Sequence, residues 1–319
     1  MSQELSRRQM IARSAACLAA GAATAVAAPA PAAEATKQGK DGPFCYCLNT
    51  ATIRGQKLPL EKEVEVAAKA GYDGIEPWVG GIKKYAEQGG SLAEMKKRLA
   101  DLGLKVESAI GFPQWIVDDD RQRAEGLEQM KRAMELVSGI GGTHIAAPPA
   151  GAYATAGMDL RKIAERYRAV LELGRKTGVV PQLEIWGASK TLSRLGEAAF
   201  VVVEAGHPDA CLLLDAFHLY RGGSSFAGLK QLNGGAMHAF HINDYPADPP
   251  RETIGDDDRV FPGDGVCPLT SILRDLRATG FRGALSLELF NPDYWKQEPL
   301  AVAKTGLEKM RAVVGRAIQ

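Results

Sequence analysis

Residues 180–217 read VPQLEIWGASKTLSRLGEAAFVVVEAGHPDACLLLDAF and contain one complete repeat of the fold. The apolar runs at 180–186 and 211–217 are short, which is typical of strands buried in a parallel sheet. Between them, residues 191–205 have the spacing of a helix with one apolar face. The stretch therefore predicts a strand–helix–strand unit whose two strands run in the same direction.

The same alternation recurs along the chain. We expect eight strands, at residues 44–49, 74–78, 105–110, 143–148, 180–186, 211–217, 237–243 and 283–289. The helices are expected near residues 60–70, 91–102, 120–138, 159–177, 191–205, 224–232, 268–279 and 298–317. Glycine follows several of these helices, where it commonly ends them. Eight repeats predict a parallel sheet that closes into a single (β/α)8 TIM barrel.

The first 35 of the 319 residues do not fit this repeat. They contain Ser6-Arg7-Arg8, then an Ala-rich apolar stretch, then small residues suited to cleavage, which is the order of an export signal. The paired arginines favour the twin-arginine route and a periplasmic or other extracytoplasmic location. A membrane anchor is the alternative, although the stretch is short and Ala-rich for a span. We expect a cleavable signal at 1–35 and the barrel at 36–319.

Charge and cysteine content narrow the choice of partners. Without residues 1–35, the chain carries 36 basic and 36 acidic side chains and has no formal net charge. Nucleic acid or an anionic membrane would favour a basic excess, so we expect neither as a partner. No later apolar run is long enough to span a bilayer. The four cysteines beyond the signal lack metal-binding spacing and are interpreted as small buried hydrophobes, at Cys45, Cys47, Cys211 and Cys267.

Four metal-ligand-type residues stand at the C-terminal ends of predicted strands. They are Glu184, Asp215, His241 and Glu288. Side chains alternate between the barrel interior and the helix layer, and in each strand the neighbouring leucines or other apolar residues take the helix side. All four polar residues therefore face the barrel axis at its mouth. Three carboxylates in one place repel each other unless a cation is present, so the pattern predicts a divalent-metal site.

The donor set indicates the metal and the chemistry. Oxygen ligands with one imidazole suit Mn²⁺, Mg²⁺, Co²⁺ or Zn²⁺, and we expect one such ion, with Mn²⁺ favoured. A hydroxy-ketone fits the positions left open, and a metal ion there would acidify the C–H beside the carbonyl. Glu184 and Glu288 approach from separate strands, so one could remove the proton and the other return it through an enediolate. The protein is therefore expected to be a metal-dependent isomerase or epimerase of a keto-sugar or keto-cyclitol.

Other side chains are expected near the same mouth. Trp115 follows the third strand and Trp186 ends the fifth; both are candidates for stacking on a sugar, with packing as the alternative. Glu76 on the second strand faces inward, either supporting the site or forming a structural pair. The segment 244–267 contains four Pro, three Gly and six Asp, which indicates a shaped mouth loop.

These stretches resemble the xylose-isomerase-like barrels grouped with sugar phosphate isomerases and epimerases, and within them the inosose (keto-inositol) isomerases. The resemblance covers roughly 42–317 and is sharpest at LLLDAFHLYRGG, HAFHINDYP, DDDRVFPGDG and LSLELFNPDYW. It implies metal ligation by the same four residues, with Glu184 and Glu288 as acid and base. It also implies substrate contacts from His218, in the Asp-x-x-His spacing, and from Arg259 in the mouth loop.

Two alternative functions are also compatible with these residues. The same enediolate could expel a substituent, which would make the protein a lyase or dehydratase acting on 3-keto-glycosides or inososes. A barrel that binds sugar without catalysis is a non-enzyme alternative. Related DNA-repair endonucleases carry an Asp-Arg-His motif in this loop, whereas this chain has Asp258-Arg259-Val260 and lacks that histidine. A homo-oligomer is compatible with the sequence.

Overall fold

The protein is described here by a computed structural model that covers residues 43–319. The export signal predicted at residues 1–35, and with it the predicted domain boundary, lies outside the described residues. Within them, eight parallel strands form one sheet in the order β3-β2-β1-β8-β7-β6-β5-β4. The strands are β1 (Cys45–Asn49), β2 (Gly74–Glu76), β3 (Lys105–Val106), β4 (His144–Ala147), β5 (Val180–Glu184), β6 (Leu212–Asp215), β7 (Met237–Ile242) and β8 (Ala284–Leu287).

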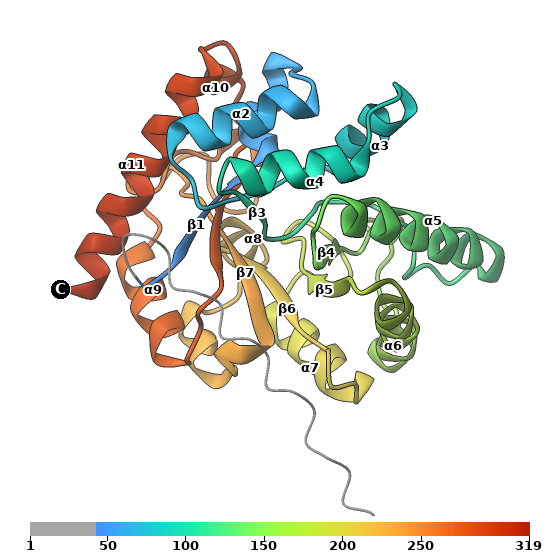
Figure 1. The fold of residues 1–319 in the computed structure, drawn as a ribbon. Coiled ribbons are helices and arrows are strands. Elements are labelled where there is room, and N and C mark those ends of the chain that lie inside the picture. Colours follow the sequence, from blue (N-terminus) through green and yellow to red (C-terminus); the bar gives the residue numbers. More distant parts are fainter. Residues whose placement is uncertain (1–42) are drawn as a thin grey trace, which may run out of the picture. The chain divides into compact units, whose positions relative to one another are not determined.

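The two ends of this sheet meet. The backbone N–H of Ala146 in β4 donates to the carbonyl of Ala109, in the segment that continues β3, over 2.8 Å. Figure 1 shows the strands at the centre with the long helices around them. This arrangement confirms the predicted (β/α)8 barrel.

The third strand is shorter than the predicted 105–110. Its ladder with β2 ends at Val106, and the pairing returns only as a single bridge between Trp78 and Ile110. Pro77 lies between the two paired parts and has no N–H to donate, which interrupts the ladder.

The helices outside the sheet agree broadly with the sequence pattern. The α-helices are α2 (Leu60–Ala70), α3 (Val79–Glu87), α4 (Leu92–Asp101), α5 (Asp120–Gly139), α6 (Leu160–Thr177), α7 (Leu195–Ala205), α8 (Ala216–Arg221), α9 (Leu269–Ala278), α10 (Pro292–Trp295) and α11 (Pro299–Ile318). Short 3₁₀ segments are η1 (Thr50–Gln56), η2 (Phe226–Gln231), η3 (Gly234–Ala236) and η4 (Asp256–Asp258). Positive φ values confirm the expected glycine helix ends at Gly71, Gly103, Gly178 and Gly280.

Two predicted helices differ from the structure. The helix expected at 191–205 begins only at Leu195, because Glu197 accepts the N–H groups of Ser193 and Arg194 and so fixes the start. The segment expected as a helix at 224–232 is the six-residue 3₁₀ helix η2, which is too short for two α-helical turns.

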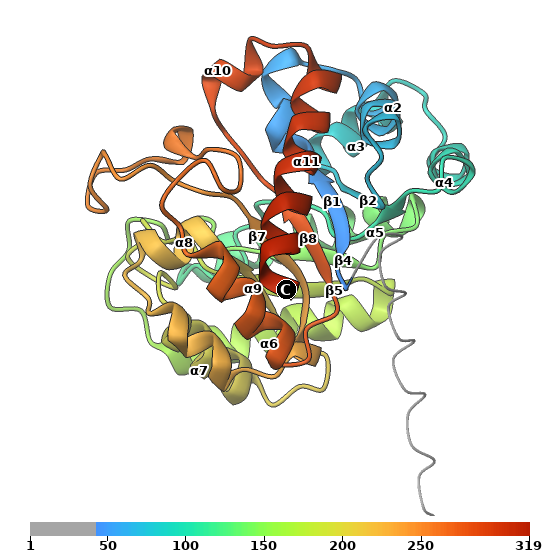
Figure 2. The same cartoon turned by 90° about the vertical axis from the view of Figure 1, so that its left-hand side faces the viewer.

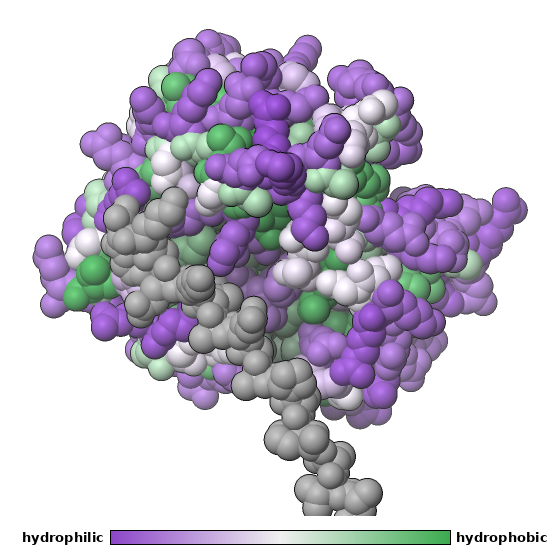
Figure 3. Space-filling view, viewed as in Figure 1, coloured by the Kyte–Doolittle hydropathy of each residue, from purple (hydrophilic) through white to green (hydrophobic). Residues whose placement is uncertain are grey.

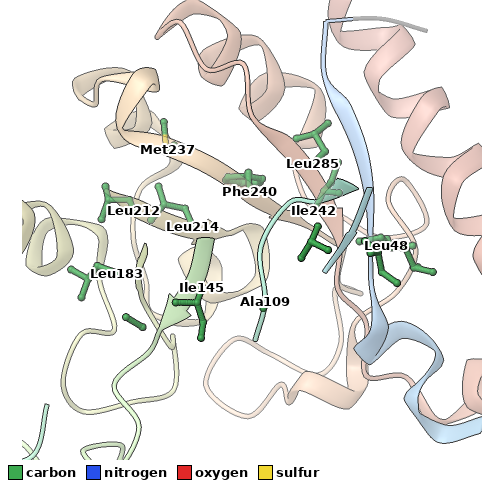
Figure 4. Packing of buried hydrophobic residues seen from close by; sticks show 14 of the residues in the cluster. Leu48, Ala109, Ile145, Leu183, Leu212, Leu214, Met237, Phe240, Ile242 and Leu285 are labelled. Carbon is green, nitrogen blue, oxygen red and sulfur yellow. The ribbon is translucent and has the colours of Figure 1, made fainter. Parts of the chain in front are cut away.

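Side chains alternate across the strands as predicted. Leucine and other large apolar residues fill the layer between sheet and helices, as Figure 4 shows for Leu48, Leu183, Leu212, Leu214, Phe240, Ile242 and Leu285. A second, smaller cluster fills the barrel interior, formed by Ile110, Ala146, Leu213 and Ala239. The alternate side chains of each strand point into the barrel, and those at the C-terminal ends of the strands are the polar residues of the barrel mouth.

The outer surface is polar over much of the molecule. Hydrophilic side chains cover the outward side of α5 in the view of Figure 3. Among residues 43–319, every helix falls short of the length and apolar character that crossing a membrane requires. The four cysteines in this range are unpaired, with Cys47 and Cys211 buried and Cys45 and Cys267 half-buried.

The segment after β7 is a structured loop, drawn in orange beside α8 in Figure 2. Asp244 ties its two ends together: one carboxylate oxygen accepts the N–H of Cys267 over 2.8 Å, and the other accepts that of Gly263 over 2.9 Å. An antiparallel bridge between Asp244 and Val260 folds the loop back over the barrel. This geometry brings Arg259 above the strand ends.

Candidate metal centre and substrate cavity

Three of the four predicted metal ligands converge at the strand ends. Asp215 ends β6, His241 lies in β7, and Glu288 directly follows β8. The parallel register pairs Asp215 with His241, and His241 with Ser286, so these positions are neighbours in the barrel. One ligand atom from each of the three lies within 4.8 Å of the others, and all three residues are buried.

The imidazole of His241 is held between two kinds of partner. Its Nε2 donates to Oε2 of Glu76 over 3.0 Å. Its Nδ1 lies 3.5 Å from Oδ2 of Asp215 and 3.3 Å from Oε2 of Glu288. This buried nitrogen makes no hydrogen bond with the described residues. A metal ligand with its second ring nitrogen on a carboxylate is the usual arrangement of metal-binding histidines, so the residues fit a metal ion.

Glu76 belongs to a buried network that supports this histidine. Its Oε2 also accepts from Ser286 Oγ over 2.6 Å and from Asn49 Nδ2 over 2.9 Å. Burial opposes ionisation of Glu76, but His241 and these hydrogen bonds outweigh it and hold its pKa below the usual range. Asn49 Nδ2 also donates to Oε1 of Glu288 over 3.0 Å, which links the support to the ligand set.

Arg259 shares the same carboxylate oxygens. Its Nη1 donates to Oδ2 of Asp215 over 2.9 Å and to Oε2 of Glu288 over 3.0 Å. The guanidinium is fully buried and also contacts Asp256. Burial would raise the pKa of Asp215, but the charge of Arg259 more than offsets it, so the pKa lies below its ordinary value. Asp215 is therefore a carboxylate.

The predicted substrate residue His218 lies beside this arginine. Nη2 of Arg259 is 3.2 Å from Nε2 of His218. Because a guanidinium can only donate, Nε2 accepts and the ring proton is on Nδ1. Burial lowers the pKa of His218, which is consistent with this neutral form. The backbone N–H of His218 donates to Oδ1 of Asp215, where α8 begins.

Glu184, the fourth predicted ligand, is outside the group of three, but it lines a cavity together with one of them, Glu288. It ends β5 and is buried, and its Oε2 has no hydrogen-bond partner among the described residues. Burial raises the pKa of Glu184 well above the ordinary value, and the charges of Glu288 and Asp215 add to the rise against the opposing effect of His241. A nearby cation would stabilise its ionised form.

A cavity of about 270 Å³ opens above these residues. It is lined by Trp78, Ile110, Phe112, Tyr153, Glu184, Trp186, Ala188, His218, Asp256, Arg259, Glu288 and Phe290. Predicted substrate residues Trp186, His218 and Arg259 are thus brought to one space with Glu184 and Glu288.

Trp115 is the exception among the predicted substrate contacts. It is fully buried outside the cavity, and its Nε1 donates to the carbonyl of Pro148 over 2.8 Å. Its ring packs against Tyr167 at 6.0 Å. The loop after β3 turns back toward the helix layer, so Trp115 fills that layer, and the packing interpretation replaces the substrate contact.

Four aromatic residues of the cavity were missed by the sequence reasoning, namely Trp78, Phe112, Tyr153 and Phe290. Trp78 ends the predicted second strand and the other three follow predicted strands, on the side of the barrel where parallel strands end. Position at or just after the end of a strand was therefore the available signal, and it applies to Phe112 as well as to Trp115.

The amino-acid sequence was compared with known protein families. Residues 64–313 match the profile of the xylose isomerase-like TIM barrel. The chain belongs to this family. The matched range includes the four predicted metal ligands together with Glu76, His218 and Arg259, whereas Asn49 precedes it.

Similar proteins include several enzymes. Inosose isomerase of Bacillus velezensis is 29% identical over 282 residues, which cover 85% of this chain and 97% of that protein. 3-Dehydroshikimate dehydratase of Pseudomonas aeruginosa is 28% identical over 79% of this chain and 39% of that longer protein. Fructoselysine 3-epimerase of Escherichia coli O157:H7 is 24% identical over 82% of this chain and 96% of the relative.

A solved structure adds information on the metal. The IOLI protein with a bound zinc atom superposes with a TM-score of 0.78 and 26% identity, over 86% of this chain and 99% of that chain. L-ribulose 3-epimerase, with a TM-score of 0.69 and 21% identity over 86% of this chain and 95% of that one, shares the fold. The zinc-bound relative and the Asp215–His241–Glu288 group together support a divalent metal ion.

Proposed function

We propose that this protein is a metal-dependent isomerase or epimerase of a keto-sugar or keto-cyclitol. The observation that carries the proposal is the placement of Glu184 and Glu288. They come from β5 and from the end of β8, and both line one cavity beside Asp215 and His241. Two carboxylates on separate walls are what a reaction needs when a proton leaves one carbon and is returned elsewhere or on another face.

The residues that would hold the metal ion are Asp215, Glu288 and His241 through Nδ1, with Glu184 as the fourth ligand. Oxygen donors with one imidazole favour Mn²⁺, with Mg²⁺, Co²⁺ and Zn²⁺ also compatible. When bound, the ion would polarise the carbonyl of a hydroxy-ketone and acidify the adjacent C–H.

The protein side chains would then carry out the proton transfers. One of Glu184 and Glu288 removes the proton beside the carbonyl, which leaves an enediolate, and the other donates a proton to complete the exchange. Asn49 donates to Oε1 of Glu288 and so restricts its orientation. Arg259 and His218 offer polar atoms for the substrate hydroxyl or carbonyl groups.

A second candidate is a lyase or dehydratase. It is favoured by the similarity to 3-dehydroshikimate dehydratase over 79% of this chain. The same enediolate can expel a β-substituent, so the two reactions share the first proton removal and differ in the fate of the enediolate. Loss of mass from the substrate distinguishes them.

A substrate panel tests the proposal. The full chain would be incubated with inososes, ketohexoses and 3-keto-glycosides, with added Mn²⁺ or with a chelator, and the products followed by NMR and mass spectrometry. We expect an isomer of unchanged mass that forms only with metal. Loss of water or of an aglycone would favour the lyase, and turnover that survives complete chelation would contradict both. Glu204→Gln, on the exposed side of α7, is the control for Glu184→Gln.

A further inference from the structure

Aromatic side chains form a continuous arc along one part of the cavity. The ring of Trp78 lies 6.2 Å from Phe290 and 5.1 Å from Phe112. The arc continues from Phe112 to Trp186 at 6.0 Å and from Trp186 to Tyr153 at 6.4 Å. These five rings come from the segments that follow five different strands, so the arc is a feature of the assembled barrel mouth.

Polar and aromatic linings occupy different parts of the barrel mouth. Glu184 ends β5, and the other charged and imidazole groups of the cavity follow β6, β7 and β8. Four of the five rings follow β2, β3, β4 and β5. Between the rings, the remaining lining residues are Ile110 and Ala188. The guanidinium of Arg54 lies 4.5 Å from the ring centre of Trp78 and 5.6 Å from that of Phe290, so a charged group already stacks on these two rings. The cavity therefore has a polar part suited to hydroxyl and carbonyl groups and a neighbouring part, around Phe112, Trp186 and Tyr153, whose surface is mainly aromatic.

The aromatic part offers few partners for the hydroxyl groups of a second polyol, because the polar groups of its five rings are the indole N–H of Trp78 and of Trp186 and the hydroxyl of Tyr153. Sugar hydroxyls need hydrogen-bond partners when they leave water, and phenylalanine offers none. The indole N–H of Trp78 is engaged with Oδ1 of Asn49 over 3.3 Å. A flat apolar group, in contrast, gains from burial and from edge and face contacts with the rings.

Two members of the arc are unusually exposed. Phe112 is 44% exposed and Tyr153 is 50% exposed, although both line a cavity that also holds the buried carboxylates. Apolar surface left open beside a reaction site is typical of a ligand-binding groove. The ligand that covers them would extend outward from the polar part.

From this division we infer that the substrate carries an aromatic substituent on its keto-sugar, as in an aryl glycoside. The keto-sugar would contact Glu184, Glu288, His218 and Arg259, and the aryl group would lie along the arc. The identity of the sugar half rests on the proposed function, whereas the arc as an aryl-binding subsite stands on the ring geometry.

Matched ligand pairs test the subsite. Binding of methyl and phenyl β-D-glucopyranoside, with the galacto and xylo pairs, would be measured by calorimetry on the metal-loaded full chain. We expect the phenyl member to bind at least about tenfold more tightly in one or more pairs. Equal affinity within every pair, or no binding of any phenyl glycoside, would overturn the inference.

Variants locate the preference. Phe112→Ala combined with Tyr153→Ala should reduce the phenyl preference to less than about threefold while the protein keeps its metal content and melting temperature. Phe200→Ala is the matched control, because this phenylalanine is 37% exposed on α7 and does not line the cavity. A phenyl preference that survives the double substitution would place the aryl group elsewhere and contradict the subsite.

The two proposals fail separately. In one outcome, phenyl glycosides bind more tightly than methyl glycosides, but no keto-sugar, with or without an aryl group, exchanges its C–H hydrogen in D₂O. The subsite then stands and the isomerase proposal fails. If unsubstituted keto-sugars react and phenyl glycosides show no preference, the isomerase proposal stands and the subsite fails.

Discussion

Nε2 of His241 lies 3.0 Å from Oε2 of Glu76, and neither side chain is exposed to solvent. The contact joins the second strand of the barrel to the seventh across its interior. It fixes both the tautomer and the direction of the imidazole, so Nδ1 is turned toward Asp215 and Glu288. Glu76 therefore positions the histidine without lining the cavity.

Replacing Glu76 should weaken metal binding. In Glu76→Gln the negative partner of Nε2–H is lost, and we expect the affinity for Mn²⁺ to fall about 10- to 100-fold. Calorimetry on the full chain measures this. Glu107→Gln is the control, because Glu107 is a partly buried carboxylate close to β3 that bonds Cys45 rather than His241. Unchanged Mn²⁺ affinity in Glu76→Gln would show that the contact is only structural.

Arg259 should compete with the metal ion for shared oxygens. In Arg259→Gln a positive charge beside Asp215 and Glu288 is removed, so we expect divalent-metal affinity to rise on the order of tenfold. The protein without metal should become less stable by about 3–5 kcal/mol, because two buried carboxylates lose their cation. Mn²⁺ titration followed by electron paramagnetic resonance gives the affinity, and chemical denaturation gives the stability.

Arg251→Gln is the control for this change, since Arg251 is an exposed arginine of the same loop. Weaker metal binding in Arg259→Gln would mean that the guanidinium holds the ligands in place instead of competing with the ion.

The sequence predicted the parts of this site that depend on strand geometry. A residue at the end of a parallel strand can point only inward or outward, and the flanking leucines around Glu288 decide which. Parallel register then places Asp215 beside His241, however far apart they are in the chain. For the same reason the eight strands and their order were predictable.

Loop directions were not predictable in this way. Trp115 and Phe112 follow the same strand, but only Phe112 lines the cavity. Trp115 instead packs against Tyr167 and donates to the carbonyl of Pro148, and both of these partners come from other repeats. The partner of Glu76 likewise depends on a contact across the barrel, which a local pattern does not contain.

The opposite end of the barrel should make the protein sensitive to acid. Burial, with a smaller contribution from His238, lowers the pKa of His144 to about 3. The unfolded chain binds this proton near pH 6.5, so stability is unaffected above that pH and falls as the pH drops from 6.5 toward 3. The loss from His144 alone should reach about 2 kcal/mol at pH 5.

Denaturation at pH 7 and pH 5 measures this loss. His144→Gln should lose correspondingly less stability between the two pH values, because the titrating group is gone. An equal loss in the original and substituted proteins would assign the acid sensitivity to other groups.

Export by the twin-arginine route is a proposal that a substitution can test. Arg7→Lys with Arg8→Lys should leave active, metal-loaded protein in the cytoplasm, because the paired arginines are what this route recognises. Cell fractionation measures the distribution. If as much of the double variant as of the original protein is found outside the cytoplasm, another export route is used.

The central claim is that Glu184 and Glu288 move a proton at the carbon beside the substrate carbonyl. Deuterium uptake at that carbon, followed by NMR in D₂O with the best substrate of the panel, tests it most directly. We expect uptake during turnover, at least about a hundredfold slower in Glu184→Gln and in Glu288→Gln, with Glu204→Gln unchanged. Full turnover with the original hydrogen retained at that carbon would contradict the account.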